Sequence, residues 1–147
     1  MPPRTLRTGL HPVHAILLSF PVSLFPAGLA SDIAYLNSAE IQWSNLSQWA
    51  ITGALIFGAI VAIWAAIDAL RSRDRSLHRG PMLYFVLVAA MWVLGLINAF
   101  KHSQDAWSSV GTTGLLLSIL CTALALAAAW IAHADAGRTT VAAGEPA

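Results

Sequence analysis

Two histidines three residues apart near the start of the chain are its best candidates for metal or redox chemistry. His11 and His14 lie about 60° apart around a helix, so both imidazoles can face one direction. Two imidazoles on one face can bind a metal ion, or one can ligate a haem while the other carries a proton. The alternative is that both are interfacial side chains reaching toward water.

Three more residues are predicted to gather with these histidines at one membrane face. Asp68 comes two residues before the end of an apolar stretch, His78 lies in the connection that follows, and His133 leaves the last apolar stretch. A carboxylate beside imidazoles can orient a tautomer or complete a metal shell. The alternative for Asp68 is an ion pair at a helix end with Arg71 or Arg73. The predicted cofactor-binding residues are His14, His11, His78, His133 and Asp68.

Other polar residues receive simpler interpretations. His102 stands beside Lys101, toward the opposite face, and is expected to be solvated. Asp32 is expected to end the first apolar stretch near the interface. Cys121, the single cysteine, excludes an intramolecular disulfide and is expected to be a small core residue.

Four apolar stretches must position these side chains. A hydrocarbon core of about 30 Å takes about 20 apolar residues as a helix, and only helices can pair every backbone group within such a stretch. The chain is 57% hydrophobic and 10% charged. The predicted fold is an all-α, integral membrane four-helix bundle in one domain, residues 1–136, followed by a disordered cytoplasmic tail, residues 137–147. The predicted spans are residues 13–36, 49–70, 82–100 and 111–132.

Basic residues predict the orientation. Lys and Arg remain in the cytoplasm because their translocation is costly. The connection at residues 37–48 has neither, and the one after the third span has only Lys101. Both termini are therefore expected in the cytoplasm. The basic residues that define this face precede span one or join spans two and three: Arg4, Arg7, Arg71, Arg73, Arg75 and Arg79.

Small residues in the second span suggest how the helices pack. Ala50, Ala54, Gly58, Ala62 and Ala66 recur every four residues. Such a ridge lets two helix backbones approach closely, and the partner is either another helix of the chain or a second copy.

The alternative for the first span is a cleaved secretory signal ending at residues 28–30, although its apolar run is longer than usual for such signals.

The opening motif resembles a known family. Its usual form is H-P-x-H-P-x-L-V-x-F-P-I, then a span ending in Asp and a second span ending in Gly-x-x-Asp. The chain has His11-Pro12-Val13-His14 and Leu17-Leu18-Ser19-Phe20-Pro21-Val22, with Asp32 and Asp68 at the two acidic places and Ala65 in place of Gly. It resembles, over about its first 100 residues, a divergent member of the bacterial membrane family catalogued as domain of unknown function 2231.

The resemblance implies a four-helix module of the bacterial inner membrane, similar to modules joined to Rieske iron–sulfur or cytochrome-like domains. It implies electron transfer, with a b-type haem as the expected cofactor and redox proteins as expected partners. Axial ligands would be His14 with His78 or His133, and without C-x-x-C-H the haem would be non-covalent.

Three hypotheses for function follow. The first is a haem- or metal-binding electron-transfer subunit, and the second is a cofactor-free membrane scaffold or assembly partner. The third is a small carrier or channel that uses Asp68 and a first helix kinked at Pro21 and Pro26, for which four short helices give little volume. No phosphate loop, nucleophile elbow or CxxC pair is present, so nothing in the sequence predicts a stand-alone enzyme. A net charge of +1 gives no reason to expect nucleic acid.

The orientation can be tested with reporter fusions. Fusions after Arg75 and Arg138 should report cytoplasm, because these points follow the second and fourth spans. Fusions after Ser44 and Asp105 should report the opposite side. A non-cytoplasmic signal after Arg75 would contradict the charge argument and the predicted gathering of the histidines.

Overall fold

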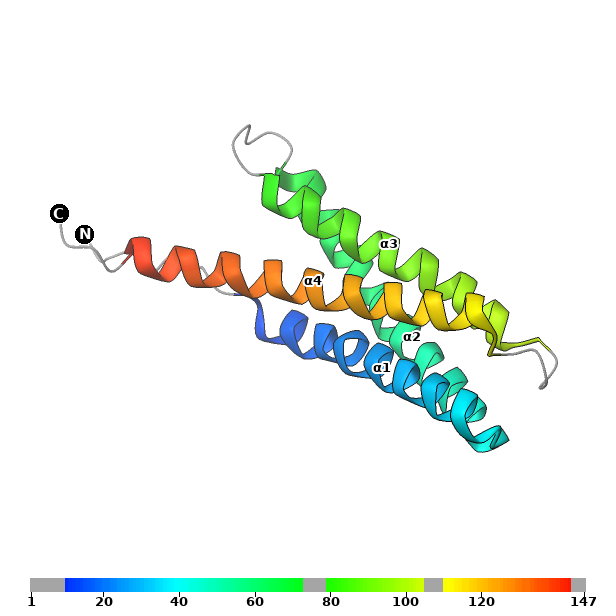
Figure 1. The fold of residues 1–147 in the computed structure, drawn as a ribbon. Coiled ribbons are helices and arrows are strands. Elements are labelled where there is room, and N and C mark those ends of the chain that lie inside the picture. The colour runs from blue at the N-terminus through cyan, green and yellow to red at the C-terminus, as the bar shows by residue number, and fades with distance from the viewer. Residues whose placement is uncertain (1–9, 73–78, 105–109, 144–147) are drawn as a thin grey trace, which may run out of the picture.

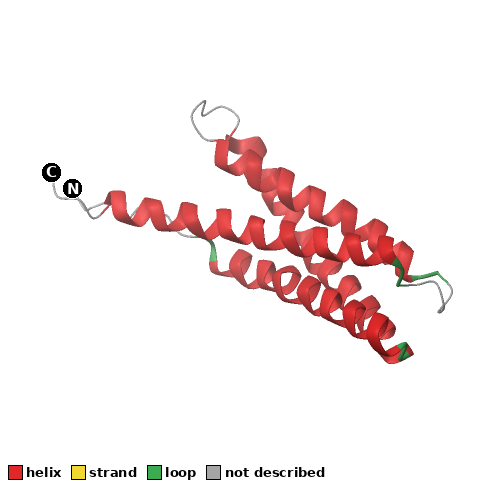
Figure 2. Ribbon diagram, in the orientation of Figure 1, coloured by secondary structure: helices red, strands yellow, loops and turns green. Residues whose placement is uncertain are grey.

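The computed structural model describes residues 10–72, 79–104 and 110–143, and these residues form four helices with no strand among them (Figures 1 and 2). The helices are α1 (Pro12–Ser38), α2 (Ile41–Ser72), α3 (Arg79–His102) and α4 (Thr112–Ala143). All four are long and apolar enough to cross a membrane. The predicted fold class, an all-α membrane bundle of four helices, is confirmed.

The helices pack as the corners of a square. Each contacts its neighbours in the order α1, α2, α3, α4 and back to α1. Successive helices run in opposite directions, so α1 and α3 begin at the end of the bundle where α2 and α4 finish (Figure 1). Thus α1 and α3 lie parallel across one diagonal.

Each helix turns one seam of residues toward the centre. The seam positions alternate three and four residues apart, a spacing of 3.5 that is typical of helices packed at a shallow left-handed crossing angle. On α1 and α3 the seams are offset by 70 residues. The α1 seam is His14, Leu18, Pro21, Phe25, Gly28 and Asp32, and the α3 seam is Tyr84, Val88, Met91, Gly95, Asn98 and His102.

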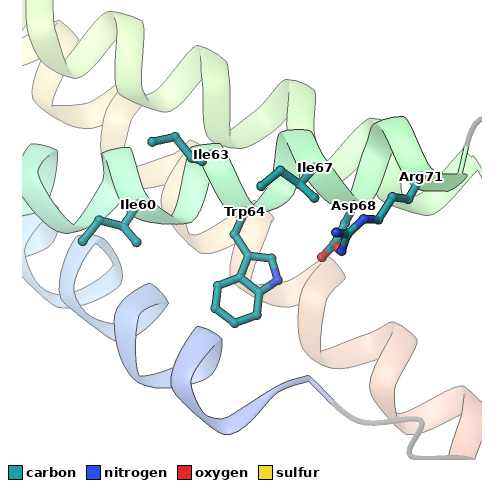
Figure 3. Close-up of a pocket in the computed structure, with 6 residues that line it drawn as sticks. All are labelled: Ile60, Ile63, Trp64, Ile67, Asp68 and Arg71. Atoms are coloured by element: carbon teal, nitrogen blue, oxygen red, sulfur yellow. The ribbon is translucent and has the colours of Figure 1, made fainter.

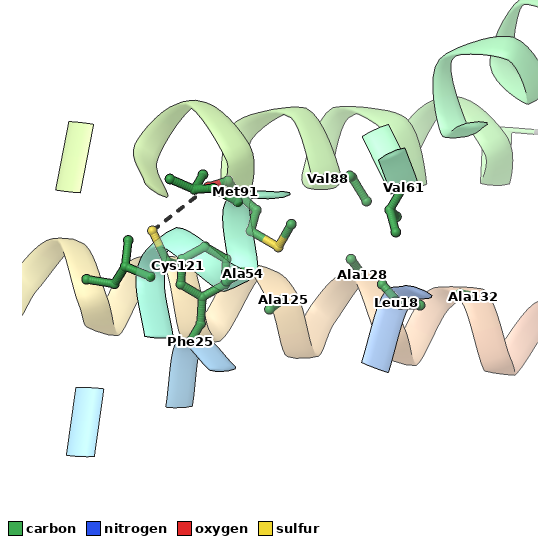
Figure 4. Close-up of a cluster of buried hydrophobic side chains, with 12 residues drawn as sticks. Leu18, Phe25, Ala54, Val61, Val88, Met91, Cys121, Ala125, Ala128 and Ala132 are labelled. Atoms are coloured by element: carbon green, nitrogen blue, oxygen red, sulfur yellow. Dashed lines mark hydrogen bonds between the residues drawn. The ribbon is translucent and has the colours of Figure 1, made fainter. Parts of the chain in front are cut away.

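The seams of α2 and α4 supply mostly small side chains, which leave room for the larger ones of α1 and α3. Their members are Ser44, Ser47, Ile51, Ala54, Gly58, Val61 and Ala65 on α2, and Gly114, Ser118, Cys121, Ala125, Ala128 and Ala132 on α4. The middle of the bundle is filled by an apolar cluster that includes Leu18, Phe25 and Met91 (Figure 4). Cys121 is buried there as predicted, with its Sγ 3.9 Å from the Met91 carbonyl oxygen.

The small-residue ridge of α2 packs within the chain. Ala54 is fully buried, and a Cβ added at Gly58 would lie 3.6 Å from Met91 and Trp92 of α3. Ala62 and Ala66 are only half-buried, because a spacing of four residues drifts about 40° per step away from the 3.5-residue seam. This placement supports the intramolecular alternative for the ridge.

Two predicted boundaries differ from the helices observed. The connection expected at residues 37–48 contains only Ala39 and Glu40, because α1 ends with Ala39 in the left-handed conformation and α2 begins at Ile41. The tail expected from residue 137 is helical through Ala143, as a continuation of α4. Residues 144–147 lie outside the described part of the chain.

Large apolar side chains cover the outside of the bundle. Trp49, Phe100 and Trp130 are among the most exposed of them, although each belongs to a helix long enough to span a membrane. Such a surface would be unfavourable in water and is favourable against lipid. The bilayer is therefore the medium that the outer face contacts.

Gly95 is the position where the diagonal packing is tightest, and it gives a test of the fold. A Cβ built at Gly95 would lie 2.9 Å from Cζ of Phe25 and 3.0 Å from Cδ2 of Leu55, both buried side chains. We expect Gly95→Leu to lower the free energy of unfolding in detergent by about 2–3 kcal/mol or more, and Gly95→Ala by less.

The matched control is Gly111→Leu. A Cβ at Gly111 meets nothing within 4 Å, so this variant should unfold like the wild type. Equal stability of Gly95→Leu and Gly111→Leu would contradict the diagonal packing of α1 against α3.

Candidate functional site

The first candidate site lies at the end of the bundle where α1 begins. His14 is 4% exposed, and its Nε2 is hydrogen-bonded to the Tyr84 hydroxyl of α3 at 2.7 Å. Its ring also meets Trp64 of α2 edge-on, with centroids 5.2 Å apart. The ring of His11 is tilted against Trp64 with centroids 5.4 Å apart, and His11 caps α1 by accepting a hydrogen bond from Val13 N at Nδ1. Two imidazoles, an indole and a phenol thus form one cluster.

Asp68 belongs to the same cluster. It lies four residues after Trp64 on α2, so the two side chains are one turn apart on the same face of the helix. It also lines an open pocket of about 270 Å³ on α2, together with Trp64, Arg71 and three isoleucines at positions 60, 63 and 67. Figure 3 shows Trp64 pointing from α2 toward α1, with Asp68 and Arg71 at the far end of the pocket. The structure places His11, His14 and Asp68 around Trp64 at one end of the bundle, and their role in binding a cofactor stays a prediction.

The other two predicted site residues do not join this cluster in the described structure. His78 lies outside the described residues. His133 is exposed, and its Nδ1 donates a hydrogen bond to the Ala129 carbonyl oxygen of its own helix at 2.8 Å. Within residues 10–72, 79–104 and 110–143, no three His, Cys, Asp or Glu side chains are close enough to hold one metal ion.

A second polar cluster, at the opposite end of the bundle, links three helices. Asp32 of α1 accepts a hydrogen bond from Ser118 of α4 at 2.5 Å and is paired with His102 of α3, whose Nε2 is 2.9 Å from its Oδ1. Asn98 Nδ2 donates to Ser118 Oγ at 2.9 Å. All four side chains are at most 1% exposed. We refer to Asp32, Asn98, His102 and Ser118 as the buried tetrad.

The tetrad corrects two sequence-based interpretations. His102 was expected to be solvated and is instead fully buried, because it occupies the last seam position of α3 and so faces the centre. Asp32 was expected to end the first helix and instead lies inside it, six residues before Ser38. Their seam phase was the missed signal, since Asp32 follows Phe25 by seven residues and His102 follows Gly95 by seven.

The tetrad has the residue types of a hydrolytic triad without its geometry. In a triad the serine hydroxyl is hydrogen-bonded to the imidazole, which removes its proton. Here the Ser118 hydroxyl donates to the carboxylate of Asp32, and the imidazole of His102 is bonded to the other carboxylate oxygen. Ser118 is therefore not activated as a nucleophile.

An apolar core separates the two clusters. His14 and Asp32 are 18 residues apart on α1, which is about 27 Å along the helix axis. The side chains between them at the centre include Leu18, Phe25 and Met91. The described residues provide no continuous line of polar side chains from one cluster to the other.

Four spanning helices, an apolar middle and two end clusters define a small polytopic membrane bundle. The chain belongs to the family described as "Predicted membrane protein (DUF2231)", whose profile matches residues 10–143. The match confirms the resemblance of the opening motif and extends it through α3 and α4. No curated protein and no solved structure was found to match the chain significantly.

The contact between His14 and Tyr84 can be measured by a double-mutant cycle. We expect Tyr84→Phe and His14→Ala to be coupled by about 1 kcal/mol in unfolding free energy, because each removes the same hydrogen bond. Tyr84→Phe combined with His133→Ala should be additive, since His133 is exposed on α4. A coupling near zero for the first pair would show that the two rings do not interact in solution.

Proposed function

We propose that this chain is a cofactor-free subunit of the bacterial inner membrane that works by contact with a partner in the bilayer. The observation that carries the proposal is how the two buried imidazoles are hydrogen-bonded. His14 Nε2 is engaged by Tyr84, and both ring nitrogens of His102 are engaged by Asn98 and Asp32. The buried histidines therefore act as hydrogen-bonding groups of the bundle.

The haem- and metal-binding hypothesis does not fit these donor sets. An axial ligand needs an imidazole nitrogen with its lone pair directed into the haem site. Of the predicted pairs, His14 has its Nε2 at hydrogen-bonding distance from Tyr84, and His133 is an exposed residue bonded to its own helix. The pairing of His14 with His78 involves a residue outside the described structure.

The carrier hypothesis is less well supported still. A carrier needs polar groups near the middle of the bilayer, where the transported species would bind. In this bundle the described polar clusters are at the two ends, and the central side chains are apolar and closely packed.

The pocket beside Trp64 is the surface on which we place the partner. It combines an apolar wall with the opposite charges of Asp68 and Arg71, which suits a helix that presents a polar residue at the membrane surface. Redox proteins are the partner class that the family resemblance suggests. Self-association through Ala54, Gly58 and Ala62 is disfavoured, because the first two are buried within the chain.

Two measurements test this function. Protein expressed with ample haem and iron should purify without a haem absorption band and without bound metal. A photoreactive amino acid at Ile67, in the pocket wall, should cross-link to a discrete second protein in native membranes, and Arg71→Glu should abolish the product. The same probe at Val93, exposed on α3, is the control and should cross-link only to lipid.

Each measurement can overturn the proposal. A haem band that His14→Ala removes would restore the electron-transfer hypothesis. Identical cross-linking from Ile67 and Val93 would mean that the pocket is ordinary lipid-facing surface.

A further inference from the structure

The hydrogen bonds of the buried tetrad have fixed directions. His102 Nδ1 lies 2.9 Å from the Asn98 carbonyl oxygen, and because a carbonyl only accepts, Nδ1 carries a hydrogen. With the Asn98 amide oriented as in the structure, its Nδ2 donates to Ser118 Oγ. The hydroxyl hydrogen of Ser118 is then donated to Asp32 Oδ2.

One hydrogen in the tetrad remains to be assigned, the one between His102 Nε2 and Asp32 Oδ1. These atoms are 2.9 Å apart in a fully buried setting. Without a hydrogen, the ring lone pair would face a carboxylate oxygen, and with one on each atom, two hydrogens would collide. The pair therefore holds one proton, either as imidazolium and carboxylate or as two neutral groups, and its net charge is zero in both forms.

The side chains bonded to the pair are not ionisable, and the half-buried Tyr35 lies three residues after Asp32 on α1. Asn98 faces it from α3 and Ser118 from α4, while α2 contributes the buried Ser44 and Ser47 at the same end of the bundle. Two charged side chains of this end belong to the described residues, namely Glu40, which is exposed, and Lys101, which is half-buried at the end of α3. Neither forms part of the tetrad.

We propose that Asp32 and His102 are a buried binding site for one exchangeable proton, and that this proton holds α1, α3 and α4 together at their end of the bundle. Its loss leaves a carboxylate in the protein interior with no cation to pair with, which is strongly destabilising. The site is therefore a pH-dependent contact between helices. This inference does not depend on the partner proposed for the other end of the bundle.

The sign of the pH dependence follows from counting protons on the pair. The ordinary pKa of histidine is about 6.5. Above this pH the two side chains hold no proton in the unfolded chain and one proton in the folded pair, so stability falls as pH rises. Between about pH 4 and about pH 6.5 both states hold one proton, and the pair contributes no slope. One proton changes the unfolding equilibrium constant by about tenfold per pH unit.

Asp32→Asn is the diagnostic variant. Its amide can donate to His102 Nε2 and accept from Ser118, so it reproduces the neutral form of the pair without a titratable proton. The folded variant should have no slope from this site above about pH 6.5 and should lose stability below it, because only its unfolded state then protonates His102. The ratio of the wild-type to the variant unfolding constant should rise about tenfold per pH unit.

Equilibrium unfolding of the full chain in mixed micelles gives this ratio across the pH range. Glu40→Gln removes an exposed carboxylate at the same end of the bundle and is the control. The ratio of the wild-type to the Glu40→Gln unfolding constant should be independent of pH near neutrality. Parallel pH profiles for the wild type and Asp32→Asn would overturn the proposal.

Nitrogen NMR of histidine-labelled wild-type protein tests the site without relying on a variant that folds. The His102 ring signals, assigned by their loss in His102→Gln, should stay unchanged between about pH 5 and about pH 8, because the pair keeps its one proton across this range. A His102 signal that moves within this range, as the signal of a free imidazole does, would overturn the proposal.

Discussion

The register between α1 and α3 is the constraint on which the other contacts depend. These parallel helices meet across the diagonal through His14 and Tyr84, Phe25 and Gly95, and Asp32 and His102. The three pairs share one offset of 70 residues, so a slip of a single residue would break all of them at once. In lipid, helix association has little hydrophobic driving force, and tight packing with interhelical hydrogen bonds must fix the arrangement. In this bundle, packing fixes the arrangement in the middle, and hydrogen bonds fix it at both ends.

The distribution of polar residues along the seams follows from the same constraint. An unpaired polar group costs most in the centre of the bilayer, where water cannot reach it. The central seam positions are accordingly apolar, and Gly95 lets the Phe25 ring approach the α3 backbone. The hydrogen-bonded pairs stand at the seam ends, where they can specify register. Such pairs also bring titratable groups into the fold, which apolar packing cannot do.

Hydropathy and length were sufficient to predict the four helices, since lipid leaves the backbone no other way to pair. The predicted topology also placed His11, His14 and Asp68 at one end of the bundle, which is where the structure has them. The tetrad was not predicted, because His102 and Asp32 were assigned by their closeness to helix ends and to Lys101. Whether a residue near a helix end faces water or the centre depends on its phase in the seam. That phase is set by contacts between helices, and the ladder of small residues on α2 suggested a spacing of four rather than 3.5.

The two ends of the bundle differ in how their polar groups are exposed. At the His14 end, His11 and Asp68 remain exposed around the half-buried Trp64, so this end presents charge and aromatic surface to its surroundings. At the Asp32 end, every member of the tetrad is buried and bonded to another member. A group that must meet a partner has to be exposed, whereas a group that must hold a helix in register has to be enclosed. Under the two proposals made above, the same residue types, histidine and aspartate, would serve recognition at one end and closure at the other, and burial would decide which.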